Sequence, residues 1–210
     1  MSPLTVLFGG AFDPPHNGHV ALALAARERF GVARLVVLVS THPGHKAVTT
    51  PAEVRLRLAR AAFPHDEVRL DPHARTIDLL REREWHDPLV LLGADQFVDF
   101  PTWKEPDGVL ELARLAVATR PGFPRERLDE VLAALPRPER VEFFEIDPVP
   151  VASRDVRARA SRGEPLGGLV PPAVADLIAR ERVYRGGARE SADAANAARL
   201  GAIPKDESAR

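Results

Sequence analysis

Two histidines, His16 and His19, stand three residues apart in a glycine-rich stretch near the start of the chain. Residues 9–19 read GGAFDPPHNGH and follow a short apolar run of the kind that forms a β-strand. Gly9 and Gly10 let the backbone approach a ligand closely, and the helix expected after them presents N–H groups and a partial positive charge to a phosphate. Imidazoles on one side of that helix start can donate hydrogen bonds to phosphate oxygens and stabilise charge on a reacting phosphorus. The stretch therefore indicates chemistry on a phosphate.

Two plainer interpretations of the histidine pair stay open at this point. One or both rings could cap the helix or bond a local carbonyl group, and the pair could belong to a zinc site. No third zinc ligand stands at motif spacing in the sequence. The order of strand, glycines and helix favours the phosphate interpretation.

Apolar runs of strand length alternate with amphipathic stretches along most of the chain. The runs cover residues 4–8, 35–39, 68–70, 89–92, 115–118 and 141–146, and the helical patterns cover residues 18–30, 51–62, 76–83, 108–113 and 125–135. Nearly continuous apolar strands separated by helices are typical of a parallel sheet covered on both faces. The sequence therefore predicts an α/β fold with a doubly wound, Rossmann-like parallel sheet. Ligands of such sheets bind beyond the carboxyl ends of the strands, where residues 9–19 are expected to lie.

The sequence also contains signals for the ends of the helices and of the domain. Gly31 is expected to end the first helix, and Pro51 to lie in the first turn of the second. Two helical stretches, 153–161 and 172–182, are expected to form a small helical cap of about residues 153–185 on a domain of residues 1–185. Residues 186–210 are small, polar and charged, and are predicted to form a disordered tail.

The composition excludes several classes of protein. The 210 residues contain no cysteine, which excludes disulfides, thiolate metal sites and cysteine nucleophiles. The formal net charge of -1 argues against a protein that coats nucleic acid. No stretch approaches the roughly 20 apolar residues that span a bilayer, and the N-terminus has no basic leader, so we expect a soluble cytoplasmic protein without a membrane partner. The oligomeric state is left open, with a homo-oligomer among the options.

Residues 9–19 resemble the G-G-x-F-D-P-x-H-x-G-H signature of the nucleotidyltransferases that share an H-x-G-H motif. Within them, the chain is most similar to the bacterial nicotinate-nucleotide adenylyltransferase family, from residue 4 to about residue 184. The resemblance implies transfer of AMP from ATP to nicotinate mononucleotide, with Mg²⁺ as the cofactor and pyrophosphate leaving, as a step of NAD biosynthesis. The acceptor's phosphate oxygen would attack the α-phosphorus in line, and no covalent enzyme intermediate is expected.

Other blocks support the narrower resemblance. HPGHK at residues 42–46 is similar to the family's P-P-H-K, GADQ at 93–96 to its G-x-D, and FPTW at 100–103 to its F-x-x-W. RPG at residues 120–122 matches its R-P-G, and VASRDVR at 151–157 resembles its I-S-S-T-x-I-R at the start of a C-terminal helix.

These blocks imply a role for each matching residue. The catalytic residues implied are His16, His19, Lys46 and Arg157. The ATP-binding residues implied are Gly9, Gly10, Phe12, Gly18, Gly93, Asp95, Ser153 and Arg154. The acceptor-binding residues implied are Asp13, His45, Thr76, Trp103 and Arg120. No side chain is assigned as a metal ligand.

Some of these residues also have plainer interpretations. Asp95 would accept hydrogen bonds from a ribose, or would only be a helix N-cap. Ser153 is expected to be both an N-cap and a phosphate ligand, and Arg157 to clamp the triphosphate. Trp103 would stack on the pyridine ring of the acceptor, or would only belong to the core. Lys46 would neutralise phosphate charge, or would be a solvated loop residue.

The sequence departs from the family pattern in two places. Ala152 and Arg154 replace a serine and the threonine of S-S-T, and residues 74–80 read ARTIDLL where the family has S-Y-T-x-D-T-L. Thr76 and Asp78 are retained in that acceptor segment. The departures keep alternatives open: nicotinamide mononucleotide or another phosphorylated acceptor, another nucleoside triphosphate, or a nucleotide-binding regulator without turnover. An RNA-binding module is disfavoured because the chain has no obvious basic appendage.

Overall fold

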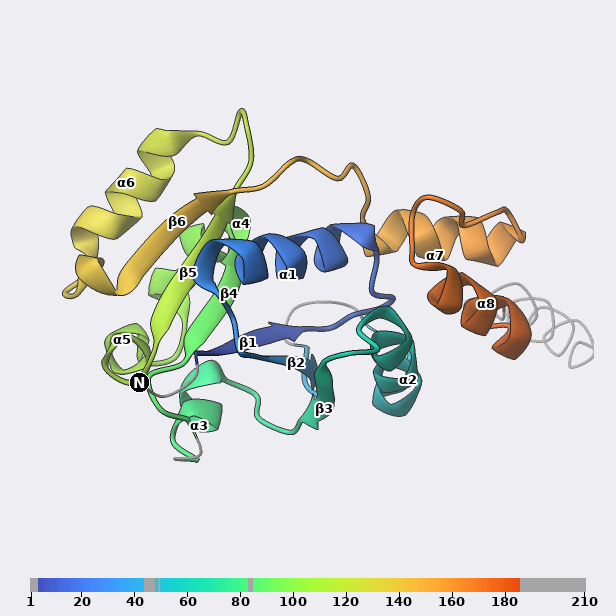
Figure 1. The fold of residues 1–210 in the computed structure, drawn as a ribbon, viewed down its shortest axis with the longest axis horizontal. Helices are drawn as coiled ribbons and strands as arrows, with labels where there is room; N and C mark the ends of the chain where they lie inside the picture. Colours follow the sequence, from blue (N-terminus) through green and yellow to red (C-terminus); the bar gives the residue numbers. More distant parts are fainter. Residues whose placement is uncertain (1–3, 44–47, 49, 83–84, 186–210) are drawn as a thin grey trace, which may run out of the picture.

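The protein is built on a single six-stranded sheet. The computed structural model describes residues 4–43, 48, 50–82 and 85–185. Every strand pair in the sheet is parallel, and the strand order is β3-β2-β1-β4-β5-β6 (Figure 1). The strands are β1 (Thr5–Gly10), β2 (Arg34–Ser40), β3 (Glu67–Asp71), β4 (Leu89–Gly93), β5 (Arg114–Thr119) and β6 (Val141–Glu145). The predicted α/β fold and all of its six strands are confirmed.

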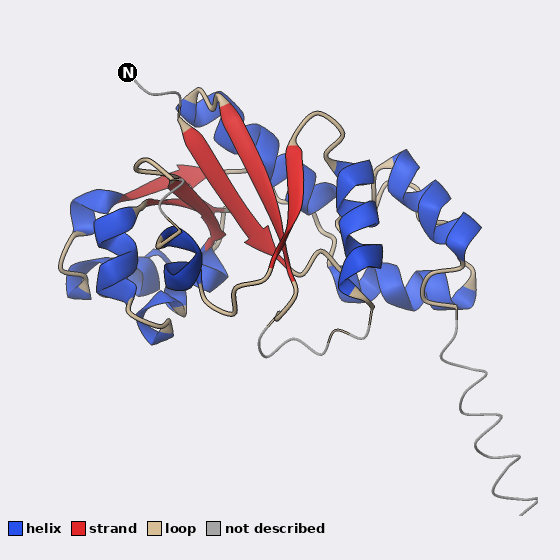
Figure 2. Ribbon diagram, turned by 90° about the horizontal axis from the view of Figure 1, so that it is seen from below, coloured by secondary structure: helices blue, strands red, loops and turns tan. Residues whose placement is uncertain are grey.

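Side chains alternate between two cores along each strand. In β2, Leu35, Val37 and Val39 face one cluster, and Val36 and Leu38 face the other. Because both faces are buried, the strand reads as an unbroken apolar run. Figure 2 shows the consequence, a sheet that runs between two groups of helices.

The helices divide between these two faces. The longer ones are α1 (Asn17–Phe30), α2 (Ala52–Ala62), α5 (Pro106–Leu112), α6 (Arg125–Ala134), α7 (Ser153–Arg162) and α8 (Pro172–Glu181). The short ones are α3 (Thr76–Leu80), α4 (Ala94–Val98), η1 (Phe100–Thr102) and η2 (Pro138–Arg140). Buried residues of α1, α2, α7 and α8 pack on one face of the sheet, and those of α3, α4, α5 and α6 pack on the other.

Helix ends follow the sequence signals in part. Gly31 ends α1 in the left-handed conformation, at φ 62°, as expected. Pro51 is the residue before α2 and not part of its first turn, which corrects the expectation by one position. The helix expected over residues 76–83 ends at Leu80, and α4, η1 and η2 were not predicted from the sequence.

The C-terminal helices share their core with the sheet. Val156 and Ala160 of α7, and Val174 and Ile178 of α8, are buried in the same cluster as Ala23 and Ala26 of α1. The tail predicted over residues 186–210 lies outside the described residues. In the part of the chain that the structure describes, no helix is long and apolar enough to cross a membrane.

The strand order places a switch point between β1 and β4. The chain runs outward from β1 through β2 and β3, then returns to β4 and runs the other way through β5 and β6. Loops leaving the carboxyl ends of β1 and β4 therefore diverge, and ligands of such sheets usually bind between loops in this position. The signature loop, which we define as residues 9–19, leaves β1 at this point and enters α1.

Candidate active site

His16 and His19 form one unit at the start of α1. His16 is the N-cap residue, and its backbone N–H donates a hydrogen bond to Nδ1 of His19 at 3.1 Å. Because Nδ1 accepts, a neutral His19 ring carries its proton on Nε2. The helix-capping and phosphate-binding interpretations are thus compatible, since one ring nitrogen caps the helix and the other is a proton-bearing donor.

The two imidazole rings stack on each other. Their centroids are 3.7 Å apart and their planes differ by 31°, which confirms that the spacing of three places both on one side of the helix start. Burial lowers the pKa of His16 from 6.5 to about 4, so this ring is neutral at pH 7 in the ligand-free protein. Nδ1 of His16 is buried and has no hydrogen-bond partner among the described residues.

Gly18 makes room for the His16 ring. A Cβ atom at Gly18 would lie 3.1 Å from both Cε1 and Nδ1 of His16, and 3.6 Å from a methyl group of Val151. The glycine between the two histidines is therefore explained by the folded-back ring. Its predicted contact with ATP stays a prediction.

Phe12 packs against the histidine pair from the core of the protein. Its side chain is 2% exposed, and its ring lies 5.1 Å from the His19 ring and 5.3 Å from the Phe8 ring. Gly10 leaves space for this ring, because a Cβ atom there would lie 3.1 Å from two of its carbons. The ring belongs to the core and packs on His19, and the predicted contact of Phe12 with ATP stays a prediction.

Asp13 is also turned into the protein. Its side chain is 3% exposed, and Oδ1 accepts a hydrogen bond from the Tyr184 hydroxyl at 2.8 Å. Its backbone carbonyl oxygen accepts a hydrogen bond from Arg157 Nη1 at 2.6 Å. The carboxylate therefore faces protein groups in the ligand-free protein, and the predicted contact of Asp13 with the acceptor stays a prediction.

Two glycines mark the ends of β1 and β4 on either side of the switch point. Among the described residues, no atom would lie within 4 Å of a Cβ atom at Gly9 or at Gly93, and neither residue has a positive φ. Packing and backbone conformation therefore explain neither glycine. The predicted contacts of Gly9 and Gly93 with ATP stay predictions.

Asp95 and Arg120 meet beyond the ends of β4 and β5. Arg120 Nη2 lies 3.3 Å from Asp95 Oδ2, and their side chains are 55% and 75% exposed, respectively. The N-cap of α4 is Gly93, so the plainer interpretation of Asp95 as an N-cap is wrong. The structure thus brings together one residue predicted for ATP and one predicted for the acceptor.

The start of α7 contributes Arg157 and Ser153 to the signature loop. Ser153 Oγ donates to the carbonyl oxygen of Pro14 at 2.9 Å. Ala152 is the N-cap of α7, so the expected capping role of Ser153 is wrong. Arg157 is 34% exposed beside the loop, whereas Arg154 is 84% exposed with Asp155 at 3.5 Å.

Thr76 and Trp103, two of the residues predicted for the acceptor, lie on the face of the sheet that α3, α4, α5 and α6 cover. Thr76 is the first residue of α3, and Trp103 is half-buried against Phe100, with ring centroids 5.4 Å apart. Lys104 Nζ lies 2.8 Å from Asp78 Oδ1. This ion pair joins residues 74–80, the predicted acceptor segment, to the residue that follows Trp103.

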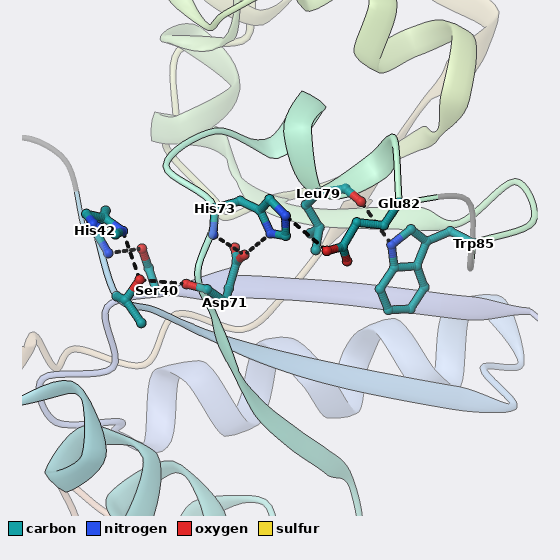
Figure 3. A network of polar contacts seen from close by, with 8 residues as sticks. Ser40, His42, Asp71, His73, Leu79, Glu82 and Trp85 are labelled. Atoms are coloured by element: carbon teal, nitrogen blue, oxygen red, sulfur yellow. Dashed lines mark hydrogen bonds and ion pairs between the residues drawn. The ribbon is translucent and has the colours of Figure 1, made fainter.

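A polar network that was not predicted from the sequence links the ends of β2 and β3 (Figure 3). His73 lies between two carboxylates, with Nδ1 2.9 Å from Asp71 Oδ1 and Nε2 3.1 Å from Glu82 Oε1. Thr41 Oγ1 donates to the carbonyl oxygen of Asp71 at 3.1 Å and lies 2.8 Å from His42 Nδ1. The network ties the base of the loop after β2 to the acceptor segment; His45 and Lys46 of that loop lie outside the described residues.

Arg55 is a further residue that the sequence analysis missed. Its side chain is 2% exposed and donates hydrogen bonds to the carbonyl oxygens of Ala11 at 2.7 Å, Ser40 at 2.8 Å and Thr50 at 3.0 Å. It therefore joins the signature loop to the segments that flank the loop after β2. An arginine on the apolar face of α2, one turn before Ala59, was the signal in the sequence.

A parallel sheet of this order, with stacked imidazoles at the helix start beyond β1, defines an α/β protein suited to bind a phosphate-bearing ligand at its switch point. Comparison with known proteins specifies the family. The model of the cytidylyltransferase-like family matches residues 7–159, and the chain belongs to this family.

Similar proteins share one description. A probable nicotinate-nucleotide adenylyltransferase of Rubrobacter xylanophilus is 34% identical over 203 residues, which cover 88% of this chain and 94% of the relative. One of Salinispora arenicola is 38% identical over 192 residues, which cover 84% of this chain and 99% of the relative. Among solved structures, nicotinic acid mononucleotide adenylyltransferase of Plasmodium falciparum in complex with NaAD matches with a TM-score of 0.66. At 16% identity, covering 87% of this chain and 98% of the other, that structure supports the fold.

Proposed function

We propose that the protein transfers AMP from ATP to nicotinate mononucleotide, and so forms nicotinate adenine dinucleotide and pyrophosphate in NAD biosynthesis. The stacked His16–His19 pair at the switch point carries this proposal, because it presents imidazole donors where phosphate is expected to bind. The similarity to probable nicotinate-nucleotide adenylyltransferases over most of the chain supports the choice of acceptor.

The proposed reaction needs positioning more than proton transfer. An oxygen of the acceptor phosphate attacks the α-phosphorus, and the bond from that phosphorus to the oxygen bridging to the β-phosphate breaks. Pyrophosphate leaves with the electron pair of that bond. A phosphate monoester loses its second proton with a pKa of about 6, so the nucleophile is already anionic at pH 7 and needs no strong base. The protein contributes alignment and charge stabilisation.

Donors at the start of α1 and on α7 supply that stabilisation in our proposal. His19 has a proton on Nε2 because Nδ1 is an acceptor, and this proton is the hydrogen-bond donor to a phosphate oxygen. Arg157 adds a guanidinium group beside the same loop. His16 is neutral before binding and can take up a proton as phosphate charge approaches, since a nearby anion raises the pKa of an imidazole.

Mg²⁺ is the cofactor in this proposal. The described residues contain no group of three or more histidine, aspartate or glutamate side chains that could hold a metal ion. In nucleotide sites Mg²⁺ usually keeps several waters and is held by substrate phosphates together with one or two carboxylates. When bound in this way, Mg²⁺ neutralises triphosphate charge.

The test measures pyrophosphate release from ATP and Mg²⁺ with nicotinate mononucleotide, with nicotinamide mononucleotide and without an acceptor. We expect product with the nicotinate form, identified by its mass as the dinucleotide. Product with the nicotinamide form alone would assign nicotinamide mononucleotide as the acceptor. Release of pyrophosphate from CTP but not from ATP would assign CTP as the nucleotide substrate. No product with either pyridine nucleotide would refute the proposed function.

A further inference from the structure

Asp13 connects the signature loop to two groups of the C-terminal segment. The Tyr184 hydroxyl donates to Oδ1 at 2.8 Å, and Arg157 Nη1 lies 3.8 Å from Oδ2. The same Arg157 nitrogen donates to the Asp13 carbonyl oxygen at 2.6 Å. The backbone and the carboxylate of one residue thus contact a single guanidinium group.

The surroundings of Asp13 require these partners. The residue is 3% exposed, and a carboxylate removed from water is costly unless positive charge and hydrogen bonds compensate. Burial, followed by the charge of Asp13, raises the pKa of Tyr184, so its hydroxyl stays protonated and donates. Arg55, which is 2% exposed, supplies a second positive charge near the carboxylate.

The two carboxylate oxygens have different partners. Tyr184 fixes Oδ1, and this leaves Oδ2 on the side of Arg157. Without the hydroxyl, the carboxylate can rotate away from Arg157 and lose its alignment with the guanidinium group. The position of Arg157 therefore depends on the Tyr184 hydroxyl, although the hydrogen bonds and ion pairs of the described residues include none between these two groups.

We infer that Asp13 and Tyr184 are positioning residues, which orient Arg157 for the triphosphate, and that Asp13 is not an acceptor ligand. This inference rests on the proposed function, in which Arg157 binds phosphate. It assigns the last part of the described chain a role in nucleotide binding that acts through the signature loop.

The test is a double-mutant cycle between Tyr184→Phe and Arg157→Ala in the full chain. The Kd of a non-hydrolysable ATP analogue is measured by calorimetry, and KM for ATP and kcat by pyrophosphate release. Tyr184→Phe removes only a hydroxyl, and we expect it to raise both Kd and KM about tenfold, the size typical of losing a hydrogen bond to a charged group. In the Arg157→Ala background, the same change is expected to have less than about a twofold effect, because Arg157 is no longer present to be positioned.

Glu181→Gln is the matched control. Arg57 Nη2 lies 2.6 Å from Glu181 Oε2, and this ion pair joins α2 to α8 without touching the signature loop. We expect the control to leave Kd and KM unchanged, although it also loosens the docking of α8. Equal losses for Tyr184→Phe in both backgrounds, or a loss of the same size in Glu181→Gln, would overturn the inference.

Two further results distinguish failure of this inference from failure of the proposed function. Inactive wild-type protein that still binds the ATP analogue would refute the proposed function, and the cycle on Kd would still decide the role of Tyr184. If Tyr184→Phe does not fold, Asp13→Asn replaces it in the same cycle, since the amide keeps an acceptor for Tyr184 and removes the charge beside Arg157. Additive effects of Asp13→Asn and Arg157→Ala would then overturn the inference.

Discussion

Replacing Gly9 by alanine is expected to stabilise the free protein and to weaken its binding of ATP. A Cβ atom at this position meets no atom of the residues that the structure describes within 4 Å, and φ is not positive, so this part of the fold accepts alanine without strain. Such replacements stabilise a protein by about 0.4–1 kcal/mol, because they reduce the conformational freedom of the unfolded chain. For a domain of this size, that corresponds to a rise in Tm of roughly 1–4 °C.

The effect on binding has the opposite sign. If the backbone at the end of β1 lies in van der Waals contact with ATP, the added methyl group occupies space that the nucleotide needs. Inserting a methyl group into a well-packed contact costs about 1–3 kcal/mol, which corresponds to a rise in KM for ATP of about 5- to 150-fold. Stability and nucleotide affinity should therefore change in opposite directions.

Thermal unfolding and pyrophosphate release, measured on the same preparations, test this prediction. Gly167→Ala is the matched control, because a Cβ atom there also meets no protein atom within 4 Å and the residue lies between α7 and α8. It should gain stability without a change in KM. A Gly9→Ala variant with the wild-type KM for ATP would refute the idea that the nucleotide lies against this glycine.

Three other perturbations follow from the site. His19→Ala should lower kcat, measured by pyrophosphate release, at least about 100-fold through the loss of a hydrogen-bond donor to phosphate. It should also destabilise the fold by about 1 kcal/mol in urea unfolding, through the loss of a helix cap. The free energy of unfolding should fall as the pH drops from about 6.5 towards 4, because His16 takes up a proton more readily when unfolded, and a His16→Asn variant should show a weaker dependence in urea unfolding. Arg55→Ala should lower the free energy of unfolding by about 3 kcal/mol, because it leaves buried carbonyl oxygens without donors.

Specific results would contradict these predictions. His65→Ala, at an exposed histidine after α2, is the control for His19→Ala, and equal losses of activity in the two variants would remove the special role of His19. Stability that rises between pH 6.5 and pH 4 would contradict the lowered pKa of His16. A loss of stability below about 1 kcal/mol in Arg55→Ala would show that water replaces the guanidinium group at those carbonyls.

Local sequence patterns were sufficient to predict most of the fold. Apolar runs such as residues 35–39 identify strands buried on both faces, and Gly31 identifies the end of α1. The strand–glycine–helix order also placed the histidine pair correctly. Short elements such as α4 were missed because five residues are too few to show a helical period.

Contacts between distant parts of the chain could not be predicted from local sequence patterns. Asp13 was assigned to the acceptor by the family resemblance, and its buried carboxylate bonds Tyr184, 171 positions away. Ser153 was expected to cap a helix because serine commonly does so, yet its hydroxyl bonds the Pro14 carbonyl oxygen instead. In each case the partner is chosen by tertiary packing, and a local pattern does not contain that information.

The long separation between Asp13 and Tyr184 also sets an order of assembly. All six strands have been synthesised by Glu145, whereas the contact to Asp13 needs Tyr184. At roughly 5–20 residues per second, the ribosome needs about 2–8 s to add the residues between them. During that interval a nascent chain can pair its sheet while the signature loop still lacks its C-terminal partners. If Tyr184 positions Arg157 as inferred, full affinity for the nucleotide is reached only after Tyr184 has bonded Asp13, so binding is expected to strengthen about tenfold at that late step.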